Sequence, residues 1–231
     1  VRRLETLDDH AIELDGAAFG TLAHDVLGRF GRDPIADSDD GGQIAQWLHD
    51  ALDDAVRQQH GTSPPAAVII QVAQLRDRLE AFSQWHAKQT ADDWRVVREA
   101  VEVSAKAPMP LNEPKAKPFT LTGRIDRIDV HPDLGYRIID YKTADTPTPP
   151  DNTHRTGPKD DKTWADLQLP LYRHLASACG VDVEKHAIEL GYVLLPKDLS
   201  RVGFSRADWS DDDLAEADDV ARWVVQRIRD G

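Results

Sequence analysis

Cysteine, methionine and long apolar runs are almost absent from this sequence of 231 residues. Its single cysteine, Cys179, excludes a disulfide within the chain and any zinc or iron–sulfur site built from several cysteines. No apolar run approaches the roughly 18 residues that a membrane-spanning helix requires. The first residues, VRRLETLDDH, also lack the apolar segment of a secretory signal. We therefore expect a cytoplasmic protein that has no membrane partner and no iron–sulfur cluster in this chain.

The sequence also lacks an initiator methionine and a Walker A motif, Gly-x-x-x-x-Gly-Lys-Ser/Thr. Without that motif, these residues contain no ATP-driven motor of the P-loop type. The sequence stops within a helical pattern, DDVARWVVQRIRDG. We therefore expect it to be a domain of a longer polypeptide.

Basic residues are outnumbered, because 28 Lys and Arg stand against 41 Asp and Glu and give a net charge of −13. This balance argues at first against a nucleic-acid partner. The acidic excess is confined to the two ends, since residues 1–60 hold 13 acids and 5 bases and residues 208–231 hold 8 acids and 3 bases. Residues 61–207 carry 20 of each sign. This middle part can therefore still present a local basic groove.

Hydrophobic residues make up 40% of the chain, which is enough for a real core. Their spacing predicts helices over the first ninety residues. In the first helix an apolar residue recurs every three or four positions, at Phe19, Leu22, Val26 and Phe30. The same period runs from Ile44 to Ala55 and from Val68 to Phe82, with Ser63 as the expected N-cap of the third helix.

Beyond Trp94 the pattern becomes typical of strands. The sequence predicts a strand at 93–105, a Pro-rich loop at 107–118, and a hairpin in which FTLTGRIDRIDV (119–130) and GYRIIDYKT (135–143) flank the turn HPDLG. A polar loop is expected over 144–162, a helix over 163–180 that Gly180 ends, a central strand at 187–196, an edge strand at 203–210 and a final helix at 211–230.

This order of elements predicts an α/β fold, a mixed sheet with helices on both faces. We expect residues 1–92 to form an N-terminal helical region and residues 93–231 to form the core, as one compact unit.

The predicted hairpin places charged residues where a strand is otherwise apolar. Side chains two apart share a face, so Asp140 and Lys142 point one way and Tyr141 the other. Antiparallel pairing brings Asp126 within reach of Asp140, and two adjoining carboxylates repel unless a cation lies between them. Mg²⁺ takes such oxygen ligands together with water and phosphate, and Lys142 would add positive charge beside an attacking water. The residues leave open a second interpretation, a surface hairpin of solvated ion pairs.

Three motifs together resemble the PD-(D/E)xK nuclease superfamily, and within it the RecB-type exonuclease domain. GTLAHDVL (20–27) resembles that family's first helix, GRIDRID…IIDYKT (123–143) its catalytic hairpin, and LQLPLY (167–172) its later helix motif. They occur in the family's order. The resemblance implies a restriction-endonuclease-like sheet flanked by helices.

The resemblance also implies a role for each matching residue. Asp126 and Asp140 would be metal-binding carboxylates, and Lys142 would orient or activate the attacking water. Four further residues are implied to bind the metal or to order the site and the DNA strand, namely His24 and the Tyr141 carbonyl as ligands, and Gln168 and Tyr172, which lie four apart on one helical face. Glu102 resembles the family's additional acid, with Glu99 as a rival. Five basic residues are candidate phosphate contacts: Arg124, Arg127, Lys159, Lys162 and Arg173.

A Mg²⁺-dependent deoxyribonuclease is the function that this resemblance implies, with Mn²⁺ as an ion that can replace Mg²⁺. It would act as an exonuclease on single-stranded DNA ends in recombination and repair, beside a helicase domain or subunit outside this chain. Two alternatives remain: an inactive DNA-binding scaffold with the nuclease fold, and a phosphoesterase acting on RNA or small molecules.

The glycine of the hairpin motif also leaves two interpretations open. Gly123 fits either a close backbone approach or a bulge.

Overall fold

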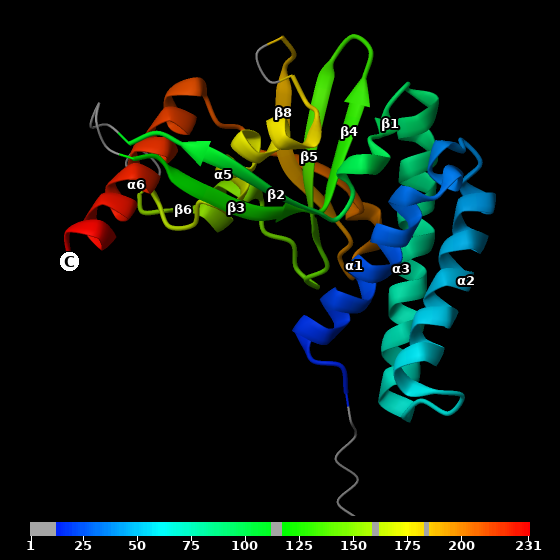
Figure 1. The fold of residues 1–231 in the computed structure, drawn as a ribbon. Helices are drawn as coiled ribbons and strands as arrows, with labels where there is room; N and C mark the ends of the chain where they lie inside the picture. Colours follow the sequence, from blue (N-terminus) through cyan, green and yellow to red (C-terminus); the bar gives the residue numbers. More distant parts are fainter. Residues whose placement is uncertain (1–12, 112–116, 159–161, 183–184) are drawn as a thin grey trace, which may run out of the picture.

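Three helices form the N-terminal part of the protein, as the apolar spacing predicts (Figure 1). The computed structural model describes residues 13–111, 117–158, 162–182 and 185–231. The helices are α1 (Gly16–Arg32), α2 (Gly41–His60) and α3 (Ala66–Ala91). One prediction here is wrong: Ser63 does not cap α3, whose N-cap residue is Pro65. None of the helices in the described ranges is long and apolar enough to cross a membrane.

A five-stranded mixed sheet forms the centre of the fold, in the order β1-β4-β5-β8-β9. Its strands are β1 (Arg95–Val96), β4 (Arg127–His131), β5 (Gly135–Lys142), β8 (Ile188–Leu194) and β9 (Gly203–Arg206). Strands β5 and β8 are parallel, and the other neighbours are antiparallel. This mixed α/β architecture is consistent with a restriction-endonuclease-like fold, and β9 lies at the edge as predicted.

The first strand of the predicted hairpin is broken in the structure. Residues 119–130 divide at Asp126 into β3 (Phe119–Ile125) and β4. Only β4 pairs with β5, whereas β3 pairs with β2 (Val103–Met109) in a separate two-stranded ribbon. The strand predicted at 93–105 is likewise interrupted, by a 3₁₀ turn at Arg98–Ala100. The chain therefore leaves the main sheet beside the acid at 126.

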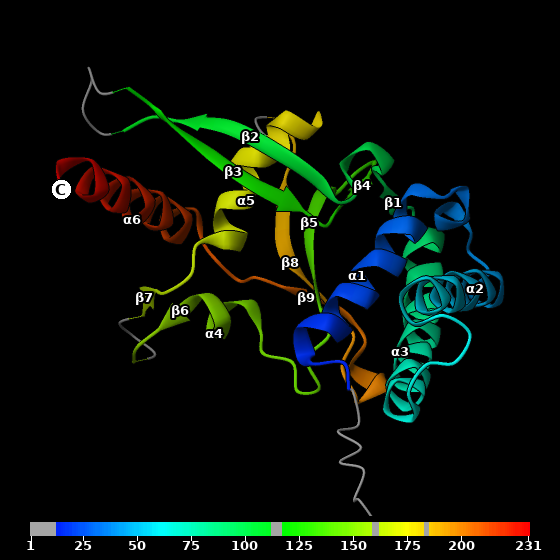
Figure 2. The same ribbon diagram turned by 60° about the horizontal axis from the view of Figure 1, so that its bottom comes forward.

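Helices cover both faces of the sheet (Figures 1 and 2). Side chains alternate along β5, so successive residues pack against the helices on opposite faces. Ile139 and Tyr141 pack in the apolar cluster that contains α1, α2 and α3. Ile138 packs in a second cluster with α5 (Gln168–Ala176). The helical region and the strands thus share one core across the expected boundary at residue 92.

The segment between β5 and α5 contains more structure than the predicted loop. It includes α4 (Pro150–His154) and the short strands β6 (Arg155–Thr156) and β7 (Thr163–Trp164). Consequently α5 begins at Gln168, five residues later than expected. A 3₁₀ turn at Ser177–Cys179 follows α5, and Gly180 ends it in the left-handed conformation, with φ 84°, so the glycine is the C-terminal stop that was predicted.

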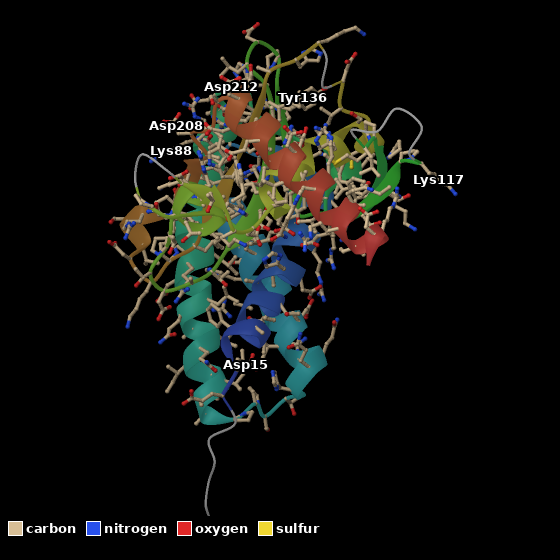
Figure 3. The ribbon with its side chains drawn as sticks, turned by 90° about the vertical axis from the view of Figure 1, so that its left-hand side faces the viewer. Asp15, Lys88, Lys117, Tyr136, Asp208 and Asp212 are labelled. Atoms are coloured by element: carbon tan, nitrogen blue, oxygen red, sulfur yellow. The ribbon has the colours of Figure 1, made fainter. Side chains whose placement is uncertain are left out.

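Helix α6 (Asp211–Asp230) covers the outer side of α5 and reaches the β2–β3 ribbon. In Figure 3 it runs from Asp212 at one end to the neighbourhood of Lys117 at the other. Arg229 donates a hydrogen bond to the carbonyl of Lys117 at 2.7 Å. This contact supports the ribbon where it projects from the sheet.

Candidate active site

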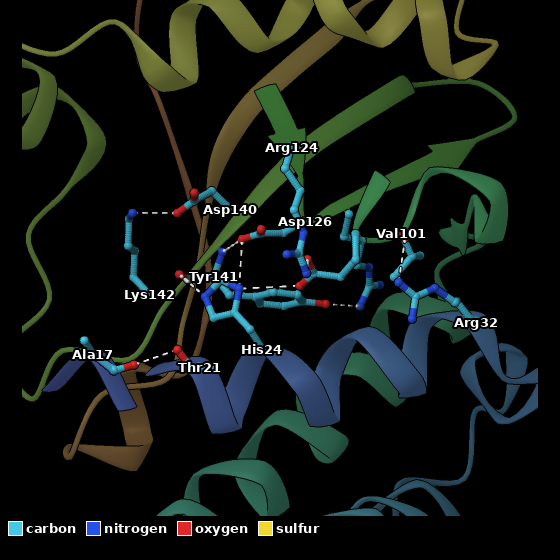
Figure 4. A network of polar contacts seen from close by, with 12 residues as sticks. Ala17, Thr21, His24, Arg32, Val101, Arg124, Asp126, Asp140, Tyr141 and Lys142 are labelled. Carbon is cyan, nitrogen blue, oxygen red and sulfur yellow. Dashed lines mark hydrogen bonds and ion pairs between the residues drawn. The ribbon is translucent and has the colours of Figure 1, made fainter. Parts of the chain in front are cut away.

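A cleft of about 1170 Å³ opens between α1, the β2–β3 ribbon and α5. Its lining includes every residue predicted for metal binding or catalysis: His24, Glu102, Asp126, Asp140, Tyr141, Lys142, Gln168 and Tyr172. Figure 4 shows His24 reaching from α1 to Asp126, with the Lys142–Asp140 pair beside this group. Segments more than 140 residues apart in sequence thus meet at the end of β5.

The strand break positions Asp126 and Glu102 side by side. Where the backbone bends, the Asp126 carboxylate accepts the Tyr141 N–H at 2.9 Å, so a side chain replaces a bond of the strand ladder. The carbonyl of Asp126 accepts the Glu102 N–H, also at 2.9 Å. Glu102 adopts φ 52°, which costs a non-glycine residue about 1–3 kcal/mol. Gly28 on α1 leaves room for it, because a Cβ there would lie 2.8 Å from Glu102 Cγ.

His24 completes a compact group of possible metal ligands. Its Nδ1 lies 3.5 Å from both Glu102 Oε1 and Asp126 Oδ2, and its Nε2 lies 3.3 Å from the Tyr141 carbonyl oxygen. One ligand atom from each of His24, Glu102 and Asp126 falls within 4.8 Å of the others. Burial opposes a charge on the imidazole, but the close contacts with the Asp126 and Glu102 carboxylates and their negative charge outweigh it and raise the pKa of His24 to about 10. The group attracts positive charge.

Asp140 and Lys142 point to the same face of β5, as predicted, and form an ion pair with 2.7 Å between Nζ and Oδ2. Asp140 does not belong to the compact three-residue group among the described residues. Burial, and then the charge of Asp126, raise the pKa of Asp140, although Lys142 opposes the shift. The negative charge of Asp126 therefore acts on Asp140.

Gln168 and Tyr172 enter the cleft from the first two turns of α5. The Gln168 amide donates to Tyr172 Oη at 2.6 Å, and its contact with Asp140 Oδ1 is longer, at 3.5 Å. Helix α5 can approach β3 because of Gly123, where an added Cβ would lie 2.7 Å from Leu175 Cδ1. Since the β2–β3 register is continuous through Gly123, the close approach is the correct alternative and the bulge is wrong.

Of the predicted phosphate contacts, Arg124 lines the cleft, where its half-exposed side chain pairs with Glu102. The prediction for Arg127 is wrong, because that side chain is 1% exposed and pairs with Asp129 inside the core. Arg173 lies outside the cleft and pairs with Asp218 of α6, and Lys162 pairs with Asp151 of α4. Lys159 lies outside the described residues.

A buried arginine that does not line the cleft was not among the residues predicted from the sequence. Arg78 of α3 is 3% exposed and donates hydrogen bonds to the carbonyls of Thr143 and Leu195, at 2.6 and 3.0 Å. It therefore ties together the chain just past the ends of β5 and β8, next to Lys142. An arginine within the apolar stripe that includes Leu75 and Leu79 was the signal.

The donor set fits a hard divalent cation. It offers carboxylate oxygens, one imidazole and the Tyr141 carbonyl, which suit Mg²⁺ or Mn²⁺. Both carboxylate oxygens of Glu102 and Oδ2 of Asp140 are buried without a hydrogen bond and have ion pairs only. Buried charges are stable when they are paired or bound to a metal.

Comparison with protein families identifies the family of this chain. The family model of the PD-(D/E)XK nuclease superfamily matches residues 1–231. A search of curated proteins found no match. Nucleases of the matching superfamily generally use divalent metal ions and bind DNA, in agreement with the ligand set in the cleft.

Proposed function

Because the chain belongs to the PD-(D/E)XK nuclease superfamily, we propose that it is a Mg²⁺-dependent deoxyribonuclease of the RecB type. One observation carries this proposal: the acids Glu102, Asp126 and Asp140 converge with His24 and Lys142 in a single cleft. Residues 1–92 would supply His24 to a nuclease core formed by 93–231.

The metal ligands in this proposal are Asp126, Asp140, His24 and the carbonyl of Tyr141, with Glu102 as a further carboxylate. When bound, Mg²⁺ polarises a phosphodiester oxygen and lowers the pKa of a bound water. The protein holds these ligands before the ion binds, since Asp126 is fixed by the Tyr141 N–H and His24 by the two acids. Such preorganisation reduces the cost of assembling the site.

Lys142 supplies the positive charge beside the reacting phosphate. Its ammonium orients the attacking water and stabilises the negative charge that develops on the phosphate. Gln168 and Tyr172 hold the Asp140 side of the cleft in place, which their mutual hydrogen bond supports. Arg124, the most exposed of the candidate cations in the cleft, attracts the DNA backbone without reading bases.

Part of the cleft lining is apolar, which supports an unpaired strand as substrate. Leu121 of β3, Leu171 of α5 and Leu167, the residue before α5, line it. Unpaired bases have exposed apolar faces that such a wall accommodates, while the phosphates remain near the charged side. We propose cleavage at single-stranded ends leaving 5′-phosphates, in recombination and repair, with a helicase domain or subunit delivering the strand.

The decisive experiment measures cleavage of end-labelled single-stranded DNA, with Mg²⁺ or with EDTA. Asp140→Ala and Lys142→Ala should each lower the rate at least about 100-fold, with circular dichroism unchanged. Matched controls are Asp208→Ala and Lys185→Ala, whose side chains are 98% and 77% exposed outside the cleft. Full activity in either cleft variant refutes the mechanism. DNA binding by the wild-type chain without Mg²⁺-dependent products would instead favour the inactive scaffold.

Substrate class and metal binding are tested separately. Parallel reactions with duplex DNA, RNA and bis(p-nitrophenyl) phosphate distinguish a deoxyribonuclease from a phosphoesterase of other substrates. Calorimetric titration with Mn²⁺ should show binding that Asp126→Ala and Asp140→Ala weaken. Unchanged binding in both variants would remove these carboxylates from the metal site.

A further inference from the structure

Lys142 is in contact with an aromatic ring as well as with Asp140. Its Nζ lies over the ring of Tyr192, 4.9 Å from the ring centroid. Tyr192 is on β8, directly beside Asp140 in the parallel ladder, and it is 1% exposed. An ammonium group is attracted to the face of an aromatic ring. The ring therefore restricts where the Lys142 ammonium can lie.

Tyr192 is itself fixed by a hydrogen-bonded chain that is buried at His154 and reaches the surface at Asp166. Its hydroxyl lies 2.5 Å from Nε2 of His154, and Nδ1 of His154 lies 2.7 Å from Asp166 Oδ1. Burial lowers the pKa of His154, although Asp166 opposes the shift. A neutral imidazole donates a hydrogen bond from Nδ1 to Asp166 and accepts a hydrogen bond from the Tyr192 hydroxyl at Nε2. All three groups are satisfied in this arrangement.

The same carboxylate connects to the other side of the cleft. Asp166 Oδ1 also accepts the backbone N–H of Gln168 at 2.8 Å, and the Gln168 amide lies 3.5 Å from Asp140. His154 is held rigidly, because it is 2% exposed and meets the ring of Trp209 edge to face at 5.5 Å. The hydrogen-bonded chain therefore connects Gln168, which contacts Asp140, with Tyr192, which contacts Lys142.

We propose that Tyr192, held by His154 and Asp166, is a positioning residue that places the Lys142 ammonium for the reaction. This inference rests on the proposed nuclease function, in which Lys142 acts on the water and phosphate. No proton needs to move along the chain, because its members act by fixing the ring. Their loss should lower kcat and leave KM for DNA and the affinity for Mn²⁺ unchanged, since none of the three lines the cleft.

The kinetic test compares Tyr192→Leu, His154→Leu and His154→Gln. Tyr192→Leu and His154→Leu should each lower kcat about tenfold or more, with KM within about twofold. His154→Gln retains an oxygen that accepts the Tyr192 hydroxyl, so it should recover most of the activity that His154→Leu loses. The matched control is Tyr136→Leu on β5, which lies in the upper part of Figure 3 and outside the cleft. Unchanged kcat in His154→Leu, or a loss confined to KM, overturns the proposal.

A spectroscopic test does not depend on activity. In protein labelled with ¹³C at the lysine Cε, the Lys142 signal is assigned by its absence from Lys142→Met. The ring of Tyr192 should shift its protons upfield, and His154→Leu should reduce that shift while His154→Gln preserves it. An unshifted Lys142 signal in the wild type refutes the inference.

The two tests separate failure of the inference from failure of the proposed function. If the wild-type chain does not cut DNA, the proposed function fails, and the Lys142 signal still decides whether Tyr192 positions the lysine. If Tyr192→Leu does not fold, the two His154 variants decide, because neither contacts Lys142.

Discussion

Replacing Arg127 by methionine should destabilise the fold strongly, although the residue lies next to Asp126 in the sequence. Arg127 and Asp129 are each 1% exposed. Two contacts join them, with Nε 2.5 Å from Oδ1 and Nη2 2.8 Å from Oδ2. On the same side, Nη2 also lies 3.1 Å from Nδ1 of His86. Removing the guanidinium would leave a buried carboxylate without its main partner.

The expected cost is about 3–5 kcal/mol, which is typical when one member of a buried ion pair is removed. Small proteins lose about 1–3 kcal/mol of stability per molar urea, so the unfolding midpoint should fall by at least about 1 M. The double variant Arg127→Met/Asp129→Leu removes both charges and should recover much of the loss. Urea titrations followed by tryptophan fluorescence and by far-UV circular dichroism measure these midpoints.

Arg124→Met is the matched control. Its side chain is 62% exposed and its partner Glu102 keeps the ion pair with His24, so the free energy of unfolding should change by less than about 1 kcal/mol while DNA binding weakens. If Arg127→Met instead unfolds at the wild-type urea concentration, the ion pair does not stabilise the core as argued. A double variant as unstable as the sum of both single variants would contradict the reasoning as well.

Three further predictions concern the site and the core. Gly123→Ala should cost about 1–3 kcal/mol in thermal unfolding, because its Cβ meets Leu175. Combined with Leu175→Ala, it should cost less than the sum of the two single variants. An unchanged melting temperature in Gly123→Ala would exclude the close approach. Glu102→Gln should weaken Mn²⁺ binding about tenfold in calorimetry, whereas Glu99→Gln should not; equal effects would remove Glu102 from the ligand set. Burial and the charge of Arg127 lower the pKa of His86 to about 3, against 6.5 when unfolded. The unfolded chain therefore binds the extra proton, and the free energy of unfolding should fall by up to about 1.4 kcal/mol per pH unit from about pH 6.5 towards 3. His86→Gln should remove that part of the slope in urea titrations at several pH values, and an identical slope would refute the assignment.

Local periodicity was sufficient for most elements because each of them buries one face. The helical spacing of Leu22 and Val26 and the alternation of Ile138 with Asp140 depend only on geometry within one element. The predicted boundaries of helices and strands were wrong where long-range contacts override the local conformational preference of the sequence. The strand at 119–130 breaks at Asp126, since the carboxylate of that residue bonds to the backbone of a neighbouring strand. Nothing within the twelve residues of that strand encodes this bond.

The choice between similar residues also required the tertiary structure. Glu99 and Glu102 are equivalent in the sequence pattern, but the turn after Ala100 leaves Glu99 exposed and directs Glu102 to His24. Arg124 and Arg127 are both arginines of the same motif. A period of two already places Arg127 opposite Asp126, but only the packing of α3 on that face makes the position a closed core. The position of Tyr192 beside Lys142, and that of His154 beside Tyr192, had no signal in the sequence.

By itself, the sequence determined the types and order of most of the elements, the acidic hairpin with its lysine, and the three motifs of a superfamily. These features are local, since they depend on residues within one turn or one strand of each other. The tertiary structure decided which acid joins His24, which arginine faces the cleft, and which side chains hold Lys142. Those outcomes depend on contacts between segments up to about 120 residues apart, as between His24 and Tyr141, and such contacts exist only once the helices have packed against the sheet.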